Sequence, residues 1–495
     1  MGIVIRQSFK NLIIIYFGLA IGYINALWLY PLILSDSEIG LIRLLISVSF
    51  LFATFASLGA INIPAKYFPY FNNKKQQHNG FLFFLIIFSL FGFTLFSILF
   101  ISFKDVIFNI YSQNAPLLLH YFYYFLPFTF IILFINLFKS YLVIQQKPVL
   151  PNLINEVLIR TFIVIGLICY FYSLFNFGEF INFLLVAYII GLVALLLYTK
   201  SLGALFLKPN FSVFKSKYLK ALLIFGGFSF LGNASNMIIA NIDGLMLSAY
   251  KGLGQTGIYT IAFFIATVIE IPKRSLSQSV ISLVSEGNKN NDIGLLEKLY
   301  KKTSINQLII GALIFIGVWV NIDNIFHIMP HSNIYIQGKW VVFYIGLGKL
   351  FDMATGINGE ILGTYYKYDL IFLIALGFVA VITNLIFIPI YGITGAALAS
   401  AISVFSFNTA RYFFLLFKMK IQPFSLNTIK VLIICAVTFI FNYFIPVERI
   451  AIVDILIRSI LIASLFGVLI VVTKSSEDIN SVILKVFNLI RKKLK

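Results

Sequence analysis

Ionisable side chains inside long apolar segments are the residues of this sequence with the clearest chemical potential. Arg43, Asp243 and Glu360 each lie in such a segment, with no oppositely charged residue three or four positions away. A lone charge in hydrocarbon is costly, so such residues normally face protein or water and mark ion or substrate pathways. We therefore expect all three to line a wet cavity. Because Arg43 and Asp243 fall at similar depth, we expect them to meet and help to close an outer gate.

Four further pairs of opposite charge have helical spacing: Glu156 with Arg160, Glu270 with Arg274, Lys349 with Asp352, and Asp454 with Arg458. Side chains three or four positions apart are neighbours on one helix, so each pair can neutralise itself. For Asp454 and Arg458 we prefer this purely structural interpretation.

Amide side chains also gather in the apolar segments, namely Asn25, Asn62, Asn233, Asn236, Asn241, Gln278 and Asn358. An amide both donates and accepts hydrogen bonds. These residues therefore suit sugar hydroxyls as well as bonds between helices.

The composition places these residues in a helical membrane protein. Of 495 residues, 60% are hydrophobic and 11% are charged, whereas soluble domains carry about 25% charged residues. A membrane-spanning helix needs about 20 apolar residues. On that criterion the sequence predicts about fourteen spans, at roughly 11–33, 39–63, 80–102, 117–138, 151–173, 180–199, 221–248, 255–281, 304–322, 338–362, 369–388, 391–416, 427–446 and 450–473. Helices are favoured over a β-barrel because the apolar runs are continuous and do not alternate.

Positive charge supports this topology. Most of the 37 lysines and arginines fall in alternate loops and in both termini, which places these loops and termini on the cytoplasmic side. Trp28, Trp319 and Trp340 fall at predicted outer ends, where membrane proteins carry an aromatic belt. The net charge of +19 is therefore a topology signal, and we expect no nucleic-acid partner.

The tail from Asp478 to Lys495 places apolar residues on one helical face with five basic residues around it. This pattern is typical of a helix that lies on an anionic membrane surface. The alternative is a solvated tail.

Other motifs carry no chemistry. Gly252-x-Gly254-x-x-Gly257 matches the dinucleotide fingerprint literally, but that fingerprint needs a soluble strand–helix unit, and here it joins two spans as a tight turn. His327 and His331 are separated by Pro330, which disfavours a helix that would align them on a metal. Cys169 and Cys435 lie in apolar runs as small core residues. We expect no cofactor, no metal site and no enzymatic activity.

Four stretches together resemble a known family. They are Ser57-Leu-Gly-Ala-x-x-x-x-Ala-Lys66-Tyr-Phe-Pro69, Asp243 with the 252–259 turn, Asn358-Gly-Glu-Ile-Leu-Gly363, and Pro389-Ile-Tyr-Gly392-Ile-Thr-Gly395-Ala-Ala-Leu-Ala399. In order and spacing, over essentially the whole chain, they resemble the polysaccharide (O-antigen type) flippases of the multidrug/oligosaccharidyl-lipid/polysaccharide (MOP) exporter superfamily.

The resemblance implies two pseudo-symmetric six-helix lobes around a central cavity, at 1–200 and 201–420. An extra helix pair follows at 421–473, and the basic amphipathic tail occupies 474–495. It also implies a bacterial inner-membrane protein that moves a polyprenyl-pyrophosphate-linked oligosaccharide to the outer leaflet by alternating access. Polysaccharide assembly proteins would be its partners.

The roles of Arg43, Arg160 and Lys349 within that cavity rest on charge and depth, since no family motif matches these three positions. Arginine and lysine hold phosphate through charge-assisted hydrogen bonds. Candidate substrate-binding residues are Arg43, Arg160, Lys349, Asn25, Asn236, Asn241 and Asn358. Candidate gating residues, or carriers of a coupling Na⁺ or H⁺, are Asp243, Asp352 and Glu360.

Other functions share this scaffold. A cation-coupled drug or metabolite antiporter would prefer an anionic cavity, whereas basic and acidic residues are mixed here. A flippase for a lipid-linked peptidoglycan precursor is a third option.

Proteins of other classes are also considered. A membrane ligase or polymerase would have a large outer loop, and the outer loops here are short. A scaffold without transport activity in a polysaccharide assembly complex is a further alternative.

Overall fold

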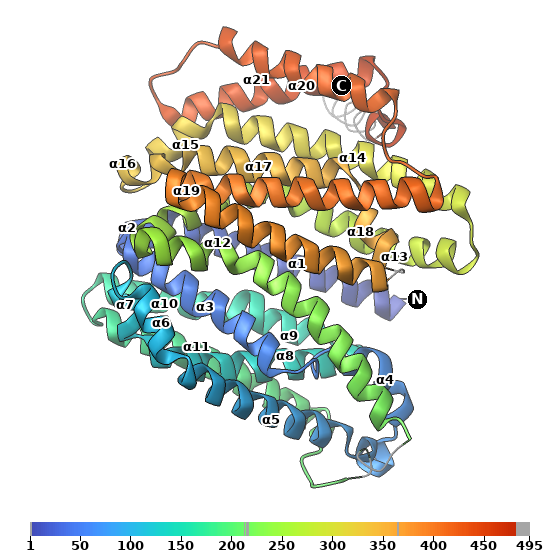
Figure 1. Cartoon of the computed structure of the whole chain (residues 1–495). Helices are drawn as coiled ribbons and strands as arrows, with labels where there is room; N and C mark the ends of the chain where they lie inside the picture. The colour runs from blue at the N-terminus through green and yellow to red at the C-terminus, as the bar shows by residue number, and fades with distance from the viewer. Residues whose placement is uncertain (1, 212, 214–216, 364–365, 482–495) are drawn as a thin grey trace. The chain divides into compact units, whose positions relative to one another are not determined.

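The computed structural model describes residues 2–211, 213, 217–363 and 366–481, and within these ranges the chain forms helices and no strand. The helical packing divides the chain into two compact units, residues 1–257 and 258–495. Each unit is a bundle of long helices joined by short connections (Figure 1). This confirms the predicted all-helical class.

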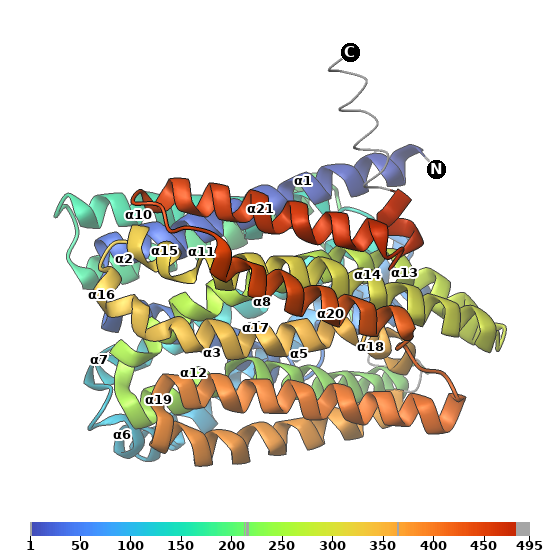
Figure 2. The same ribbon diagram turned by 90° about the horizontal axis from the view of Figure 1, so that it is seen from above.

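Two long helices each contain a glycine that breaks them into two arms. They are α12 (Leu219–Thr267), broken at Gly252 with φ +86°, and α19 (Tyr366–Met419), broken at Gly392 with φ +58°. Only glycine adopts such backbone angles readily. The two arms of α19 lie side by side in both views (Figures 1 and 2).

Eleven helices of the described residues are long and apolar enough to cross a membrane, α12 and α19 counting once each. If α12 and α19 are each divided at their glycine and α17 (Lys339–Ala354) is added, the number of spans is compatible with the predicted fourteen.

The first unit is built around α8 (Phe125–Ile144), which packs between α3 (Asp36–Ala56) and α11 (Phe177–Ser201). Helix α3 begins with a capping box, in which Ser35 and Glu38 satisfy each other's backbone N–H groups. The other helices of this unit are α1 (Gly2–Ile24), α2 (Tyr30–Ile33), α4 (Ile63–Phe71), α5 (Phe81–Ser102), α6 (Lys104–Tyr111), α7 (Pro116–His120), α9 (Val149–Leu153) and α10 (Ile159–Phe171). Two π-helical segments interrupt them, Asn25–Leu29 after α1 and Ile154–Leu158 after α9.

The second unit is built around α17, which packs between α14 (Ile293–Val320) and α19. The 3₁₀ turn η5 (Val268–Glu270) leads into α13 (Ile271–Lys289), and α18 (Asn358–Leu362) follows α17. Short helices α15 (Ile322–Ile328) and α16 (Ser332–Tyr335) connect α14 to α17. The C-terminal pair is α20 (Leu426–Phe441) and α21 (Ala451–Val472).

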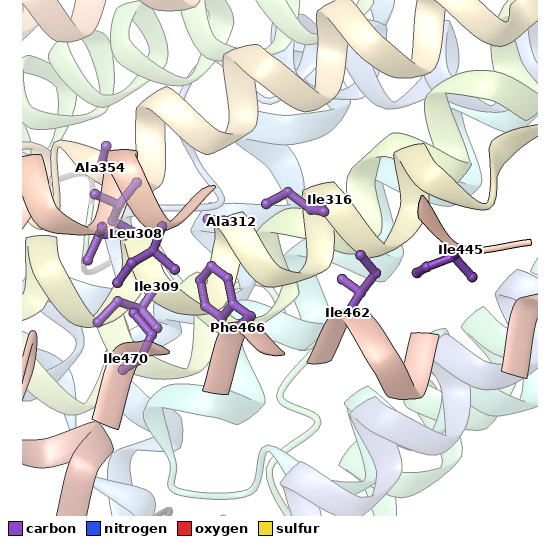
Figure 3. Close-up of a cluster of buried hydrophobic side chains, with 11 residues drawn as sticks. Leu308, Ile309, Ala312, Ile316, Ala354, Ile445, Ile462, Phe466 and Ile470 are labelled. Atoms are coloured by element: carbon purple, nitrogen blue, oxygen red, sulfur yellow. The ribbon is translucent and has the colours of Figure 1, made fainter. Parts of the chain in front are cut away.

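The C-terminal pair is attached to α14 by an apolar seam. Ile462, Phe466 and Ile470 of α21 pack against Leu308, Ile309, Ala312 and Ile316 of α14 (Figure 3). At one end of the pair the buried Asp454 accepts two hydrogen bonds of 3.1 Å from Arg458. Arg458 also donates to Asn442 at 2.6 Å. The predicted self-neutralising pair is confirmed and clips α21 to the end of α20.

The C-terminal tail is described only as far as residue 481, and most of the predicted amphipathic helix lies outside the described residues. At its start, Asp478 forms an ion pair of 2.9 Å with Lys302 of α14. Asp478 also accepts a hydrogen bond of 2.9 Å from Asn306. The lobe boundaries at 200 and 420 stay predictions.

Candidate functional site

Four charged side chains of the second unit form a cluster that we call the charge square. Lys273 lies 2.6 Å from Asp352, and Lys349 lies 2.5 Å from Glu270. Glu270 and Lys273 come from the junction of η5 and α13, while Lys349 and Asp352 come from α17. Because each chain segment contributes one acid and one base at a spacing of three, the charges alternate around the square.

Local structure explains why both segments present their charges together. Glu270 ends the 3₁₀ turn η5 and Lys273 lies in the first turn of α13, and helical side chains three positions apart are neighbours. Pro272 near the start of α13 has the backbone angle that a first helical turn needs. On α17, residues 349 and 352 share a face because an α-helix repeats every 3.6 residues.

A buried amide chain supports the carboxylate of Asp352. The Asn408 side chain of α19 donates to Asp352 Oδ1 at 3.1 Å. Asn408 Oδ1 in turn accepts hydrogen bonds from Thr355 at 3.1 Å and from Asn358 at 2.8 Å. Asn358, Thr355 and Asn408 are all at most 1% exposed. The carboxylate is therefore held at a defined position by groups from three helices.

The end of α17 brings Asn358 to this chain of amides. Helix α17 ends at Ala354, and Gly356 follows in a left-handed conformation with φ +62°, which is a common way to end a helix. The hydroxyl of Ser304 on α14 donates to the carbonyl oxygen of Ala354 at 2.6 Å. The chain then restarts as α18 with Asn358 at its first position.

One pair of partners differs from the prediction. Spacing along one helix pairs Lys349 with Asp352, whereas the structure pairs Lys349 with Glu270 and Asp352 with Lys273 across two segments. The predicted pair of Glu270 with Arg274 stays a prediction. A charged side chain can form an ion pair either with a residue one turn along its own helix or with a residue on a neighbouring segment. Because η5 and α13 pack near α17, the partner on the neighbouring segment is favoured here. The side chain of Arg274 lies outside the described residues.

A second charged cluster lies in the first unit. Arg160 forms the predicted ion pair with Glu156 at 2.7 Å and donates to the carbonyl oxygen of Gly18 at 2.5 Å. A side chain at Gly22 would overlap the guanidinium, so the glycines of α1 make room for it. Asn25 donates to the carbonyl oxygen of Arg160 at 3.4 Å.

Both helices that carry this cluster contain a π-helical turn. Asn25 opens one and Glu156 lies within the other. Such turns are rare and occur often at functional sites, because they shift the register of the side chains that follow. The arrangement brings the predicted residues Asn25 and Arg160 together.

The glycine-rich turn at 251–257 packs against the start of α3. A side chain at Gly257 would overlap the carbonyl oxygen of Asp36, and one at Gly40 would overlap that of Leu253. Asn114 also donates to the carbonyl oxygen of Ala249 at 2.7 Å. Gly257 and Gly40 thus serve close backbone approach, in agreement with the prediction of a tight turn.

This packing brings the surroundings of Arg43 and Asp243 together. Leu44 follows Arg43 on α3, and Gly244 follows Asp243 on the first arm of α12. These two following residues lie close together, since a Cβ on Gly244 would lie 3.6 Å from Cδ2 of Leu44. Asp243 is buried and Arg43 is half-buried. Their action as an outer gate stays a prediction.

Three other candidates do not join these clusters. Asn241 is buried and donates to Met237 of its own helix at 2.7 Å, and Asn236 is exposed. Glu360 is half-buried on α18. At the preceding residue, Gly359, an added Cβ would lie 2.8 Å from Nη1 of Arg411. Among the described residues, no group of three or more His, Cys, Asp or Glu could hold a metal ion.

Sequence reasoning missed Lys273 and Asn408 as site residues. Lys273 lies within the predicted span 255–281, and its place in an apolar segment is the signal that could have identified it. Asn408, within a predicted span, resembles the other intramembrane amides, and that resemblance is the signal that could have identified it.

Residues 7–281, more than half of the chain, match the family model described as polysaccharide biosynthesis protein. The chain belongs to this family. A search of curated proteins returns no match.

Solved structures show that this member of the polysaccharide biosynthesis protein family has the fold of the MOP superfamily. The lipid II flippase MurJ in an inward closed conformation aligns with a TM-score of 0.72 at 18% identity, covering 92% of this chain and 97% of that chain. An inward-facing multidrug resistance MATE family transporter aligns with a TM-score of 0.60 at 15% identity, over 84% of this chain and 94% of that one. An outward-facing multidrug resistance MATE family transporter aligns with a TM-score of 0.52 at 16% identity, over 84% of this chain and 95% of that one.

These findings confirm the predicted family, and they show the fold that the predicted superfamily implies. This member of the family is a multi-pass membrane protein, and its relatives by family and by fold act in polysaccharide biosynthesis and transport.

Proposed function

We propose that this protein is a flippase that moves a polyprenyl-diphosphate-linked oligosaccharide from the inner to the outer leaflet of the bacterial inner membrane by alternating access, with both termini in the cytoplasm. The observation that carries the proposal is the charge square, which brings together two lysines, one at the end of the apolar segment Leu219–Lys273 and one on α17, in a member of the polysaccharide biosynthesis protein family. Two ammonium groups suit the two phosphoryl groups of such a lipid carrier.

The physical demands of the reaction agree with such a site. A glycan cannot cross hydrocarbon without losing its hydrogen bonds to water, so a polar path must replace them. The polyprenyl tail is apolar and can stay in the bilayer. The protein therefore needs polar groups along the path of the headgroup only.

We assign roles within this scheme by chemistry. In the second unit Lys349, together with Lys273, holds the diphosphate, and in the first unit Arg43 and Arg160 are candidates for the same role. Asn25, Asn236 and Asn241 offer amides to sugar hydroxyls, whereas Asn358 acts on Asp352 through Asn408. Asp243, Asp352 and Glu360 carry the coupling H⁺ or Na⁺ or take part in gating. Polysaccharide assembly proteins are the proposed partners.

A lipid-linked peptidoglycan precursor is the second candidate substrate, favoured by the fold similarity to the lipid II flippase MurJ. Its headgroup is also a diphosphate-linked sugar, so the same basic residues would serve. The mixed charges of the square disfavour the third option, an exporter of cationic drugs, because each carboxylate already has a lysine partner.

The test is a chromosomal deletion with complementation. We expect the deletion strain to accumulate the lipid-linked oligosaccharide on the inner leaflet, as measured by radiolabelled lipid extraction and by a leaflet-specific glycan probe. Complementation of a strain depleted of its lipid II flippase tests the second candidate. Normal surface polysaccharide and no trapped lipid-linked glycan in the deletion strain would refute the proposal.

A further inference from the structure

A polar cavity of about 260 Å³ lies at one end of the first unit, where three chain segments meet. These segments are the turn that follows α4, the turn that follows α8, and the end of α11. The cavity shares no residue with the charge square or with the cluster around Arg160. Its polar lining residues are Asn72, His78, Gln145, Gln146 and Lys147, and its apolar lining residues are Phe68, Ile144 and Leu202.

The first wall of the cavity has an unusual backbone. Four consecutive residues, Gln77 to Gly80, have left-handed angles, with φ between +51° and +77°. Residues other than glycine rarely adopt these angles, and then singly. Such a conformation persists only where the surrounding structure determines it, and it occurs often at binding sites.

Contacts on both sides hold this left-handed turn in place. The imidazole of His78 packs against the rings of Phe68 and Phe206, with centroid distances of 5.1 Å and 5.2 Å. A side chain at Gly80 would overlap the carbonyl oxygen of Asn210. His78 is therefore only 1% exposed, although it lines the cavity. This wall needs no ligand to form.

The end of α8 forms the second wall. The backbone N–H groups of Gln146 and Lys147 donate to carbonyl oxygens in the last turn of α8, both at 3.0 Å, which is a common way to end a helix. The hydroxyl of Tyr141 donates to the carbonyl oxygen of Ala204 at 3.1 Å. This bond ties α8 to the chain that follows α11, so the second wall is also fixed.

The charge of the segments around the cavity has one sign. Residues 57–80, 141–151 and 197–211 contain three, one and two lysines, respectively, and no aspartate or glutamate. The nearest acidic residue along the chain, Glu156, forms an ion pair with Arg160 at 2.7 Å. Membrane topology accounts for the lysines as such, because cytoplasmic loops are enriched in them. The cavity adds a site, because it places Lys147 beside three amides.

We propose that this cavity binds a phosphate ester that carries hydroxyl groups, of the size of a glycerol phosphate or a hexose phosphate. The ammonium of Lys147 donates charge-assisted hydrogen bonds to the phosphate. The amides of Asn72, Gln145 and Gln146 both donate and accept hydrogen bonds, which hydroxyl groups require. The volume lies just below the range of about 300–1,000 Å³ for drug-sized ligands, so it suits a small ligand.

Two sources can present this chemistry. One is the headgroup of phosphatidylglycerol in the inner leaflet, since basic pockets on the cytoplasmic side bind anionic lipid headgroups. Val143 and Leu197, near the ends of α8 and α11, are 44% and 61% exposed and offer apolar surface to acyl chains. The other source is a soluble hexose phosphate. In both cases the ligand joins the ends of α4, α8 and α11. This inference goes beyond the proposed function and does not depend on it.

The experiment uses the full chain in detergent and one probe for each source. Native mass spectrometry measures the retention of phosphatidylglycerol against that of phosphatidylcholine, which has no net charge and no free hydroxyl group. Isothermal titration calorimetry measures the binding of glucose 1-phosphate against that of glucose. We expect preferential retention of phosphatidylglycerol, or binding of glucose 1-phosphate without binding of glucose.

Two substitutions at exposed positions test the cavity without disturbing the core. Lys147→Gln removes the ammonium, and we expect the affinity for the probe to fall at least about tenfold. Asn72→Asp keeps the shape of the side chain and adds a negative charge, which should abolish binding. Lys208→Gln is the matched control, because Lys208 is equally an exposed lysine on one of the three segments but does not line the cavity. It should bind as wild type.

The variants decide between a site and general attraction. Binding of either probe that depends on Lys147 and Asn72 but not on Lys208 supports the proposal, and the probe that binds identifies the source. Equal losses in Lys147→Gln and Lys208→Gln would overturn it, because they would show attraction to the surface as a whole. Binding of neither probe would also overturn it and would leave a cavity filled by water. No transport is measured, so these outcomes leave the flippase assignment untouched.

Discussion

The ammonium of Lys273 lies 2.6 Å from the carboxylate of Asp352, although 79 positions separate the two residues in the chain. Lys273 also donates to the backbone carbonyl oxygen of Asp352 at 3.1 Å. This double contact joins α13 to α17 and, through Asn408, to α19. One ion pair therefore links the charge square to the helices that surround it.

Removing Lys273 should destabilise the second unit. In the Lys273→Gln variant, Asp352 loses its cation, and we expect a loss of about 1–3 kcal/mol, less than for a fully buried pair because both side chains are partly exposed. Thermal unfolding in detergent measures it. Lys339→Gln is the control, since its partner Asp323 is 67% exposed, and we expect less than about 0.5 kcal/mol there.

Adding Asp352→Asn to Lys273→Gln should restore most of this stability but not transport. The double variant has no unpaired carboxylate, yet it lacks the ammonium that we propose for the diphosphate. Recovery of transport along with stability would show that the pair is only structural.

A methyl group at Gly257 should disturb the contact between the turn and α3. It would overlap the carbonyl oxygen of Asp36, and overpacking of this kind costs about 1–3 kcal/mol. We expect Gly257→Ala to lower the melting temperature and the rate of glycan export. In Gly244→Ala the nearest atom, Cδ2 of Leu44, lies 3.6 Å away, so this matched variant should be tolerated. Equal effects of the two substitutions would contradict the close-approach explanation.

The proposed gate predicts a charge-swap rescue. Arg43→Asp and Asp243→Arg should each abolish export, and the double variant should restore part of it, because the attraction between the two helices is re-formed with reversed polarity. Surface polysaccharide in a deletion strain complemented with each variant is the readout, with expression checked by immunoblot. Absence of rescue with normal expression counts against the gate.

The ion pair at the start of the tail should depend on pH. Hydrogen bonds from Lys302 and Asn306 lower the pKa of Asp478 below its ordinary value of about 3.8. The pair therefore contributes its full stability above that ordinary value and loses it as the pH falls through the lowered pKa. Because both side chains are more than 40% exposed, we expect at most about 1 kcal/mol.

Hydrogen exchange of residues 474–481 tests this pH dependence. Asp478→Asn should raise exchange at pH 7, while wild type should show the same increase only below about pH 4. Equal exchange in both proteins at pH 7 would mean that the pair does not hold the segment.

The sequence alone was sufficient for the class of protein, for most of the helices and for the tight turn at 251–257. These features depend on local chemistry, since apolar length specifies a span and glycine permits the backbone angle at Gly252. Two ion pairs, Glu156 with Arg160 and Asp454 with Arg458, could also be predicted, because they follow helical spacing.

Only the tertiary structure decided the partners within the charge square and the role of Asn408. Each charge there has one potential partner on its own helix and another on a facing segment. The choice depends on how η5, α13 and α17 pack, which spacing along one helix does not encode. The role of Gly18 and Gly22 could not be predicted for the same reason, because these glycines leave space for Arg160, which lies on another helix.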